Sequence, residues 1–200
     1  MRTPQDFRRE NVKELFDKIL KDNKTKLVPK NISINESINS DFTSVSFSLD
    51  VISGENIRTY NFIDVEGKGF VDAVFTTCYQ EFVESFPSIK NLNLVDLVVK
   101  PIFSMSKKES GTDARTDVMF RVEIKGHGLS EFSARSRSIV HASFQAMAEA
   151  FEFYINCDRT FHHLSLCLDD ANSRHRGDTA QACVADLAKL TTVNTYERKR

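Results

Sequence analysis

The segment Glu66-Gly67-Lys68-Gly69-Phe70-Val71-Asp72-Ala73 decides the fold, because it joins a predicted strand at residues 57–65 to a predicted helix at 71–86. Two glycines and an acid at a helix start are typical of a turn that binds an anion or an amino acid. Glycine lets the backbone approach a ligand, and the first helical N–H groups lack partners within the helix. A tight turn with a structural cap has the same pattern, so both interpretations stay open.

A second strand-to-helix junction follows at Ser136-Arg137-Ser138-Ile139-Val140-His141-Ala142-Ser143-Phe144-Gln145-Ala146, which predicts a helix over Ile139–Asn156. Before each of the two helices, apolar and polar residues alternate with the period of strands. Strands are predicted at 42–51, 57–65, 92–103, 118–124 and 131–138. The order of strands then helix, repeated, predicts an α+β fold with an internal pseudo-repeat, arranged as a sheet-and-helix sandwich.

The flanking segments are predicted to differ from this central unit. Residues 1–41 contain a helix that starts at Thr3-Pro4, followed by a linker or irregular edge strand over 24–41. Residues 157–200 form an extension in which 169–178 is loop-like and 179–190 is a short helix. We therefore divide the chain into 1–41, 42–156 and 157–200.

Composition narrows the class of protein. The 200 residues have 40% hydrophobic and 28% charged side chains and a formal net charge of -1, which favours a folded domain and gives no indication of nucleic-acid binding. No apolar run approaches the roughly 20 residues of a membrane span, and no signal peptide follows Met1. The four cysteines form no C-x-x-C pair, so a reducing, cytoplasmic compartment is expected.

Several possible reactive groups have simpler structural explanations. His162-His163 with Cys157 and Cys167 match no standard zinc spacing. His141 and Ser143 are two residues apart on a helix and point to different sides, which argues against a Ser/His dyad. Cys78 lies on an apolar helix face and is expected in the core. Arg135 and Arg137 share a strand face, where binding an acidic ligand and simple solvation are both open.

Three elements in order resemble the C-terminal regulatory, or LeuA dimer, domain of α-isopropylmalate and citramalate synthases. The elements are the segment Gly67–Ala73, then Gly111-Thr112-Asp113-Ala114 before a strand, then Ser138–Ser143 with Ala146. The resemblance covers residues 43–156. It implies a pair of βββα-like units that form a homodimer and bind a feedback inhibitor, leucine or isoleucine, near the dimer interface.

The resemblance also implies which residues bind this effector, while no catalytic, metal or cofactor site is expected. The implied ligand-binding residues are Gly67, Gly69, Phe70, Val71, Asp72, Ala73, Asp113, Ala114 and Ser143. In this interpretation backbone N–H groups bind the ligand carboxylate, and Asp72 caps the helix or receives the ammonium. Phe70 is a departure, since the family usually has proline there.

A second departure is the absence of the family's TIM barrel, which needs about 250 residues, and of its His-x-His metal element. If the sequence is a whole protein, as Met1 and the terminal helix favour, we expect a stand-alone regulatory module of leucine biosynthesis that lacks the synthase activity and acts in trans on a synthase-like catalytic subunit. If the sequence is an excised domain, the barrel has been removed. If the chain has an enzymatic activity, the resemblance implies that of a 2-isopropylmalate synthase, which is an acyltransferase. A scaffold that kept the fold and lost the ligand is the main alternative, favoured by Phe70, and an enzyme with new chemistry ranks last.

Overall fold

The secondary structure repeats one pattern, three strands followed by a helix, twice along the chain. The structure is a computed structural model that describes residues 4–102 and 115–196. The elements are α1 (Pro4–Ile19), the 3-10 turn η1 (Lys21–Asn23), β1 (Thr25–Glu36), β2 (Thr43–Ser53), β3 (Asn56–Gly67), α2 (Phe70–Val83), the 3-10 turn η2 (Pro87–Asn91), β4 (Leu92–Ile102), β5 (Arg115–Ile124), β6 (Gly128–Ser136), α3 (Ile139–Ser173) and α4 (Gly177–Leu190). The strands form two antiparallel sheets, β1-β2-β3 and β4-β5-β6. The α+β prediction is therefore confirmed.

The central strand of each sheet follows from its alternating sequence. In β2, Val45, Phe47 and Leu49 are buried, while the intervening residues occupy the other face. A hairpin turn joins β2 to β3, and Gly54 there has a φ of +61°, a conformation that glycine adopts without strain. In β5, the apolar residues at every second position, from Val118 to Ile124, have no exposed surface.

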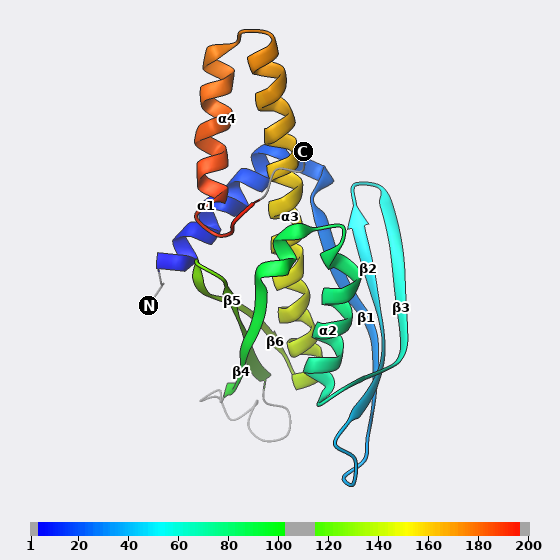
Figure 1. Cartoon of the computed structure of the whole chain (residues 1–200). Coiled ribbons are helices and arrows are strands. Elements are labelled where there is room, and N and C mark those ends of the chain that lie inside the picture. The colour runs from blue at the N-terminus through cyan, green and yellow to red at the C-terminus, as the bar shows by residue number, and fades with distance from the viewer. Residues whose placement is uncertain (1–3, 103–114, 197–200) are drawn as a thin grey trace.

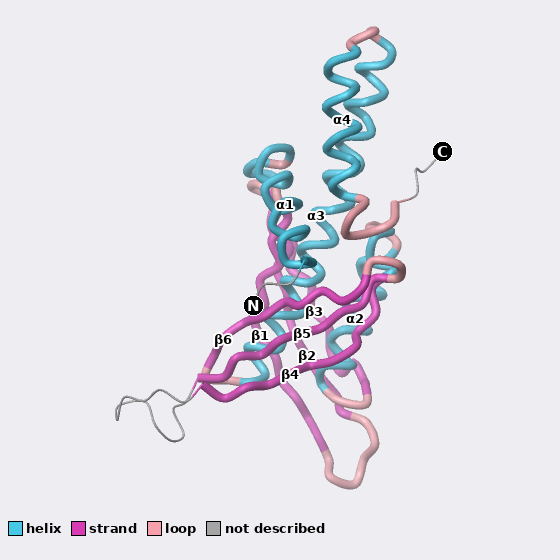
Figure 2. Tube along the Cα trace, turned by 90° about the vertical axis from the view of Figure 1, so that its left-hand side faces the viewer, coloured by secondary structure: helices cyan, strands magenta, loops and turns pink. Residues whose placement is uncertain are grey.

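The two sheets enclose α2 and α3, as Figures 1 and 2 show. Helix α2 packs on β2 and β3, whereas α3 contacts β1 of the first sheet and β5 and β6 of the second. Aromatic rings join these layers. The Phe47 and Phe144 ring centroids are 5.4 Å apart, and those of Phe75 and Phe120 are 6.0 Å apart. One hydrophobic core therefore unites both repeats, with the helices between the sheets.

Polar side chains of α3 hold neighbouring segments in place. The Asn156 amide accepts from the Thr25 N–H and donates to the Thr25 carbonyl, each at 2.8 Å. The Glu152 carboxylate accepts from the Leu27 N–H at 3.0 Å. These contacts satisfy backbone groups at the start of β1 that do not pair with β2. Helix α3 therefore supports the edge of the first sheet as well as the core.

The segment over 24–41, predicted as a linker or an irregular edge strand, contains the edge strand β1. This strand has 12 residues, pairs with β2 along its length and has a register shift between Pro29 and Asn31, so the boundary at 41/42 separates strands of one sheet. Helix α3 does not end at Asn156 as predicted but continues to Ser173, so the boundary at 156/157 falls inside a helix. The loop predicted over 169–178 is also wrong, because only residues 174–176 separate α3 from α4. The short helix predicted over 179–190 is confirmed as α4.

The second half of α3 and α4 form a helical hairpin that projects beyond the sheets (Figure 1). Helix α1 packs across its base, where Lys18 Nζ lies 2.6 Å from a carboxylate oxygen of Asp186. In the part of the chain that the structure describes, no helix is long and apolar enough to span a membrane.

Candidate functional site

The glycine turn brings the end of β3 against the first turn of α2. Gly67 is buried, and a Cβ atom on it would lie 2.5 Å from the backbone nitrogen of Ala73. Gly69 is the N-cap of α2 with an extended φ of -179°, and a Cβ atom there would meet nothing within 4 Å. Position 67 therefore requires glycine because the backbone there lies close to α2 of the same chain.

Asp72 caps the same turn. Its carboxylate accepts a hydrogen bond from the Lys68 N–H at 3.0 Å, and its side chain is exposed. An acid in the first turn is also stabilised by the positive end of the helix dipole. The sequence left two interpretations open for this turn, a ligand-binding site and a structural cap. The structure shows the hydrogen bond that a structural cap makes. A role of Asp72 in receiving a ligand ammonium stays a prediction.

The start of α3 is capped by serine. The Ser138 hydroxyl accepts from the His141 N–H at 3.2 Å, and the Ser136 hydroxyl accepts from the Ser138 N–H at 3.2 Å. His141 is exposed, and its Nδ1 lies 3.4 Å from the Ser136 hydroxyl. The imidazole therefore contacts Ser136 in the turn.

Ser143 differs from the other serines at this helix start. It has no exposed surface, and its Oγ has no hydrogen-bond partner. A buried hydroxyl without a partner costs about 1–3 kcal/mol, so such a group calls for an explanation. Among the implied ligand-binding residues that the structure describes, Ser143 is a buried polar group with unused hydrogen-bonding capacity.

The two helix starts lie at the same end of the molecule, as the courses of α2 and α3 in Figure 1 show. The Phe151 ring of α3 packs 5.4 Å from Phe75 and 6.2 Å from Phe82 of α2. Ser143 lies about two helical turns before Phe151, so this packing places it level with the first turn of α2. The fold thus places the starts of α2 and α3 at the same level of the molecule, while Asp113 and Ala114 lie outside the described residues.

This arrangement, which we call the helix-start site (residues 67–73 and 138–143), favours negative charge. Each helix N-terminus carries about half a positive charge and presents N–H groups without helical partners. Phe70 and Val71 are partly buried and pack against the core, which places apolar surface beside these donors. A carboxylate attached to an apolar side chain matches both properties.

Other sequence candidates are not arranged for chemistry. Cys78 is buried, which raises the pKa of its thiol to about 12 and keeps it protonated at neutral pH. Cys157 is fully buried, whereas His162 and His163 are exposed on the same helix. Within residues 4–102 and 115–196, no three His, Cys, Asp or Glu side chains group closely enough to hold a metal ion. Arg135 pairs with Asp117 at 3.5 Å.

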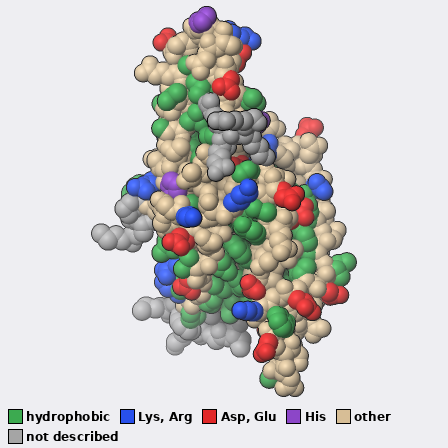
Figure 3. Space-filling model, in the orientation of Figure 1, with side chains coloured by type: hydrophobic (Ala, Val, Ile, Leu, Met, Phe, Trp, Pro, Cys, Tyr) green, Lys and Arg blue, Asp and Glu red, His purple; other side chains and the backbone are tan. Residues whose placement is uncertain are grey.

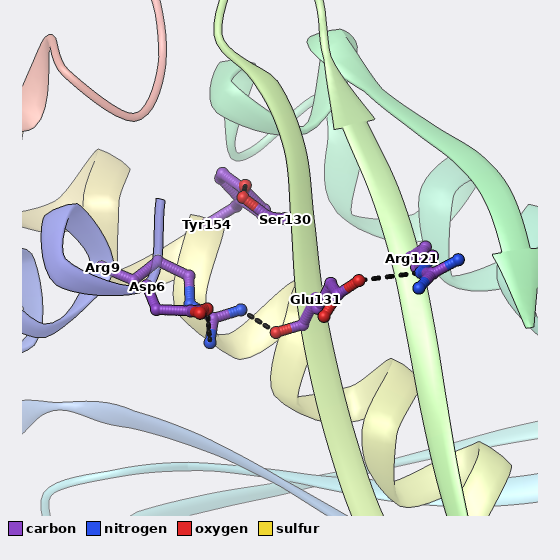
Figure 4. Close-up of polar contacts among 6 residues, drawn as sticks. All are labelled: Asp6, Arg9, Arg121, Ser130, Glu131 and Tyr154. Carbon is purple, nitrogen blue, oxygen red and sulfur yellow. Dashed lines mark hydrogen bonds and ion pairs between the residues drawn. The ribbon is translucent and has the colours of Figure 1, made fainter. Parts of the chain in front are cut away.

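Figure 4 shows a polar cluster that joins α1 to the second sheet and that the sequence did not indicate. The Arg9 guanidinium donates to the Glu131 carbonyl and lies 4.5 Å from the centre of the Phe132 ring. The Glu131 carboxylate in turn accepts from Arg121 at 2.8 Å. Burial raises the pKa of Tyr154, which donates to Ser130 at 3.4 Å and stays neutral. These charges are paired within the chain, so the cluster is structural.

Two open surface hollows lie at the other end of β3 from Gly67. One, of about 410 Å³, is lined by Asp17, Lys21, Asp22, Lys24 and Lys26. The other, of about 600 Å³, is lined by Asp22, Asn23, Ser53, Gly54, Glu55 and Asn56. Both are polar and carry charges of mixed or negative sign, so neither matches the apolar effector that the resemblance implies.

No model of a known protein family and no curated protein matches this chain. The resemblance to the synthase regulatory domain therefore rests on the three sequence elements.

Proposed function

We propose that the chain is a non-catalytic regulatory domain that binds a branched-chain amino acid, or the related 2-oxo acid, at the helix-start site within a homodimer. Two observations support this function: α2 and α3 begin at the same end of the molecule, and the Ser143 hydroxyl near the start of α3 is buried without a hydrogen-bond partner. In this arrangement the effector carboxylate accepts from the first N–H groups of the helices, and Ser143 supplies a further hydrogen bond.

The homodimer uses an apolar band over α2 and β4, where Figure 3 shows hydrophobic side chains gathered on one face. The band comprises Val71, Phe75, Tyr79, Leu94, Leu97 and Val99. Val99 is 39% exposed, and the others are partly buried against the core. Contiguous exposed apolar surface of this kind marks protein interaction sites. Because the band begins at Val71, a second copy on it would border the helix-start site.

The effector is tested by thermal denaturation with leucine, isoleucine, valine and their 2-oxo acids, followed by calorimetry. A ligand that binds only the native state must raise the melting temperature in a saturable manner. Ser143→Ala should leave the unliganded protein equally or more stable, because it removes an unsatisfied hydroxyl, and should weaken the response to the effector.

Thr160→Val is the matched control for this experiment. The Thr160 hydroxyl is also buried without a partner, but it lies about 25 Å further along α3. The control should keep the full response to the effector. An absent response across the panel, or an equal response in wild type and Ser143→Ala, would contradict the proposed site.

The dimer is tested separately by sedimentation of Val99→Asp, which places a charge in the apolar band. Val184→Asp is the control, since Val184 is 54% exposed on α4, away from the band. Dissociation of the first variant and not of the second supports the proposed interface. A monomeric wild type at micromolar concentration would contradict it.

The scaffold is the second candidate, and the glycine turn itself favours it. Gly67 packs against Ala73 and Asp72 caps Lys68, so both residues have structural roles without a ligand. A stable dimer with no effector response would support this function. In either case, a synthase-like catalytic subunit of leucine biosynthesis is the proposed partner in trans.

A further inference from the structure

The α3–α4 hairpin places two cysteines opposite each other. Antiparallel helices pair residues that are equally distant from their connecting turn, here residues 174–176. Counted outward from this turn, Ala171 and Ala180 fall in the first such layer, and Cys167 and Cys183 fall in the next. Small alanine side chains beside the cysteines allow the two helices to approach closely, as a disulfide between Cα atoms about 4.4–6.8 Å apart requires.

The two cysteines are neighbours that differ in accessibility. Burial first, and then the neighbouring Cys167 sulfur, raise the pKa of the Cys183 thiol, and both cysteines are free. Cys167 is partly exposed, whereas Cys183 is 5% exposed. The pair therefore has an accessible sulfur for a small oxidant and a sheltered thiol beside it. An accessible sulfur with a second cysteine beside it to resolve a sulfenic acid is one feature of redox-sensitive cysteines, and the buried Cys78 and Cys157 lack that exposure.

We propose that Cys167 and Cys183 form a reversible disulfide modification site that responds to peroxide. The Cys167 thiolate attacks hydrogen peroxide and, with one proton, gives a sulfenic acid and water. The Cys183 sulfur then attacks the sulfenic sulfur, and its proton leaves with the hydroxyl group as a second water. Two thiols are oxidised to one disulfide while one peroxide is reduced to two waters. A thiol reductant reverses the modification by exchange.

The disulfide fixes the hairpin at its contact with α1. Asp186 lies one turn after Cys183 on α4 and accepts from Lys18 of α1 at 2.6 Å and from Lys189 at 2.8 Å. Joining α3 to α4 at the preceding layer restrains Asp186 relative to both helices. Oxidation is therefore expected to stabilise the base of the hairpin without changing the helix-start site, which lies at the other end of α3.

The test uses the full chain treated with hydrogen peroxide under native conditions, followed by intact mass measurement and peptide mapping. Wild type should lose about 2 Da, the mass of two hydrogen atoms, and give a peptide that joins Cys167 to Cys183. The melting temperature should rise by about 5 °C and return after reduction. Cys167→Ser and Cys183→Ser should show neither effect, and Cys78→Ser should behave like wild type.

Three results would overturn the modification site. The first is oxidation of Cys167 to sulfinic acid without the loss of about 2 Da. The second is a disulfide-linked dimer on a non-reducing gel. The third is a cross-linked peptide that forms only after unfolding, which labelling of the buried Cys157 by an alkylating reagent would reveal in the same samples.

Discussion

The glycines at 67 and 69 look equivalent in the sequence, but their surroundings differ. Gly67 is buried against the backbone of Ala73, whereas Gly69 has open space around its Cα atom. At both positions φ lies outside the left-handed region, so the difference is one of contact and not of backbone conformation. Of these two positions, only 67 therefore requires a glycine.

Gly67→Ala is predicted to destabilise the protein by about 1–3 kcal/mol, because the added Cβ atom overlaps backbone that cannot move as a flexible side chain can. Gly69→Ala is the matched control and should change the unfolding free energy by less than about 0.5 kcal/mol. Urea unfolding of the two variants measures the difference. Equal stabilities would show that the turn opens enough to accept a methyl group at either position.

Glu152 gives a prediction on pH dependence. Burial raises the pKa of its carboxyl, and the hydrogen bond from the Leu27 N–H lowers it to a smaller degree. A raised folded-state pKa means that this group's contribution to stability is complete below its unfolded pKa, about 4.3, and is lost as pH rises through the folded pKa.

Glu152→Gln should therefore flatten the fall in unfolding free energy as pH rises above about 4.3, because the amide keeps an oxygen to accept from Leu27 and never ionises. Unfolding by urea at a series of pH values measures this slope. Glu10→Gln, at an exposed position of α1, is the control. A parallel shift of the whole curve, with no change in slope, would contradict the assignment to Glu152.

At the scale of elements, β1 depends on α3 as much as on its sheet partner. The start of β1 pairs with the end of β2 on one side, and on the other side its backbone groups bond to Asn156 and Glu152. An edge strand with unpaired N–H and C=O groups is a template for unwanted pairing, and these side chains cover that edge.

Asn156→Ala is predicted to cost about 2–5 kcal/mol, because it removes two hydrogen bonds and leaves the buried Thr25 N–H and carbonyl without these partners. Hydrogen exchange should show the loss of protection at Thr25, since its amide bonds to this side chain. His163→Ala, on the exposed side of the same helix, should change neither quantity. Destabilisation without faster exchange at Thr25 would contradict the role of Asn156 in holding β1.

At the scale of the whole molecule, the sheets share their core through the helices. Phe151 is 1% exposed and packs on Phe75, which also contacts Phe120 of the second sheet. Phe82, another neighbour of Phe151, packs on Tyr60 of the first sheet. Phe151 is therefore connected to the first sheet through Phe82 and to the second sheet through Phe75. These contacts couple the stabilities of the two sheets.

Phe151→Ala is therefore predicted to destabilise both repeats together, by about 3–5 kcal/mol, in one cooperative transition. Hydrogen exchange at Phe47 in β2 and Phe120 in β5 reports on the two sheets separately and should show the same loss of protection. Leu166→Ala, at a position of α3 that is 58% exposed, is the control. Loss of protection in only one sheet would show that the repeats unfold independently.

The sequence predicted local elements well where one face of an element is buried. The alternation in β2 and β5 and the glycine and serine turns before α2 and α3 are local signals, because burial of one face imposes a fixed period. The same signals located the helix-start site but left the role of Gly67 open. Its contact is with Ala73, six residues away, across a turn whose geometry the sequence did not specify.

Sequence alone therefore determined the α+β class, the repeated order of strands and helix, and the two helix starts, since these follow from periodicity and capping. Tertiary structure alone decided between a linker and an edge strand for 25–36, and it decided that α3 continues past Asn156 and that Cys167 neighbours Cys183. The physical reason is that polar residues such as Asn156 and Asp158 read as a helix end, whereas in the fold they bond to Thr25 and Ser88. Partners more than 60 residues apart supply these contacts, and local propensity does not encode them.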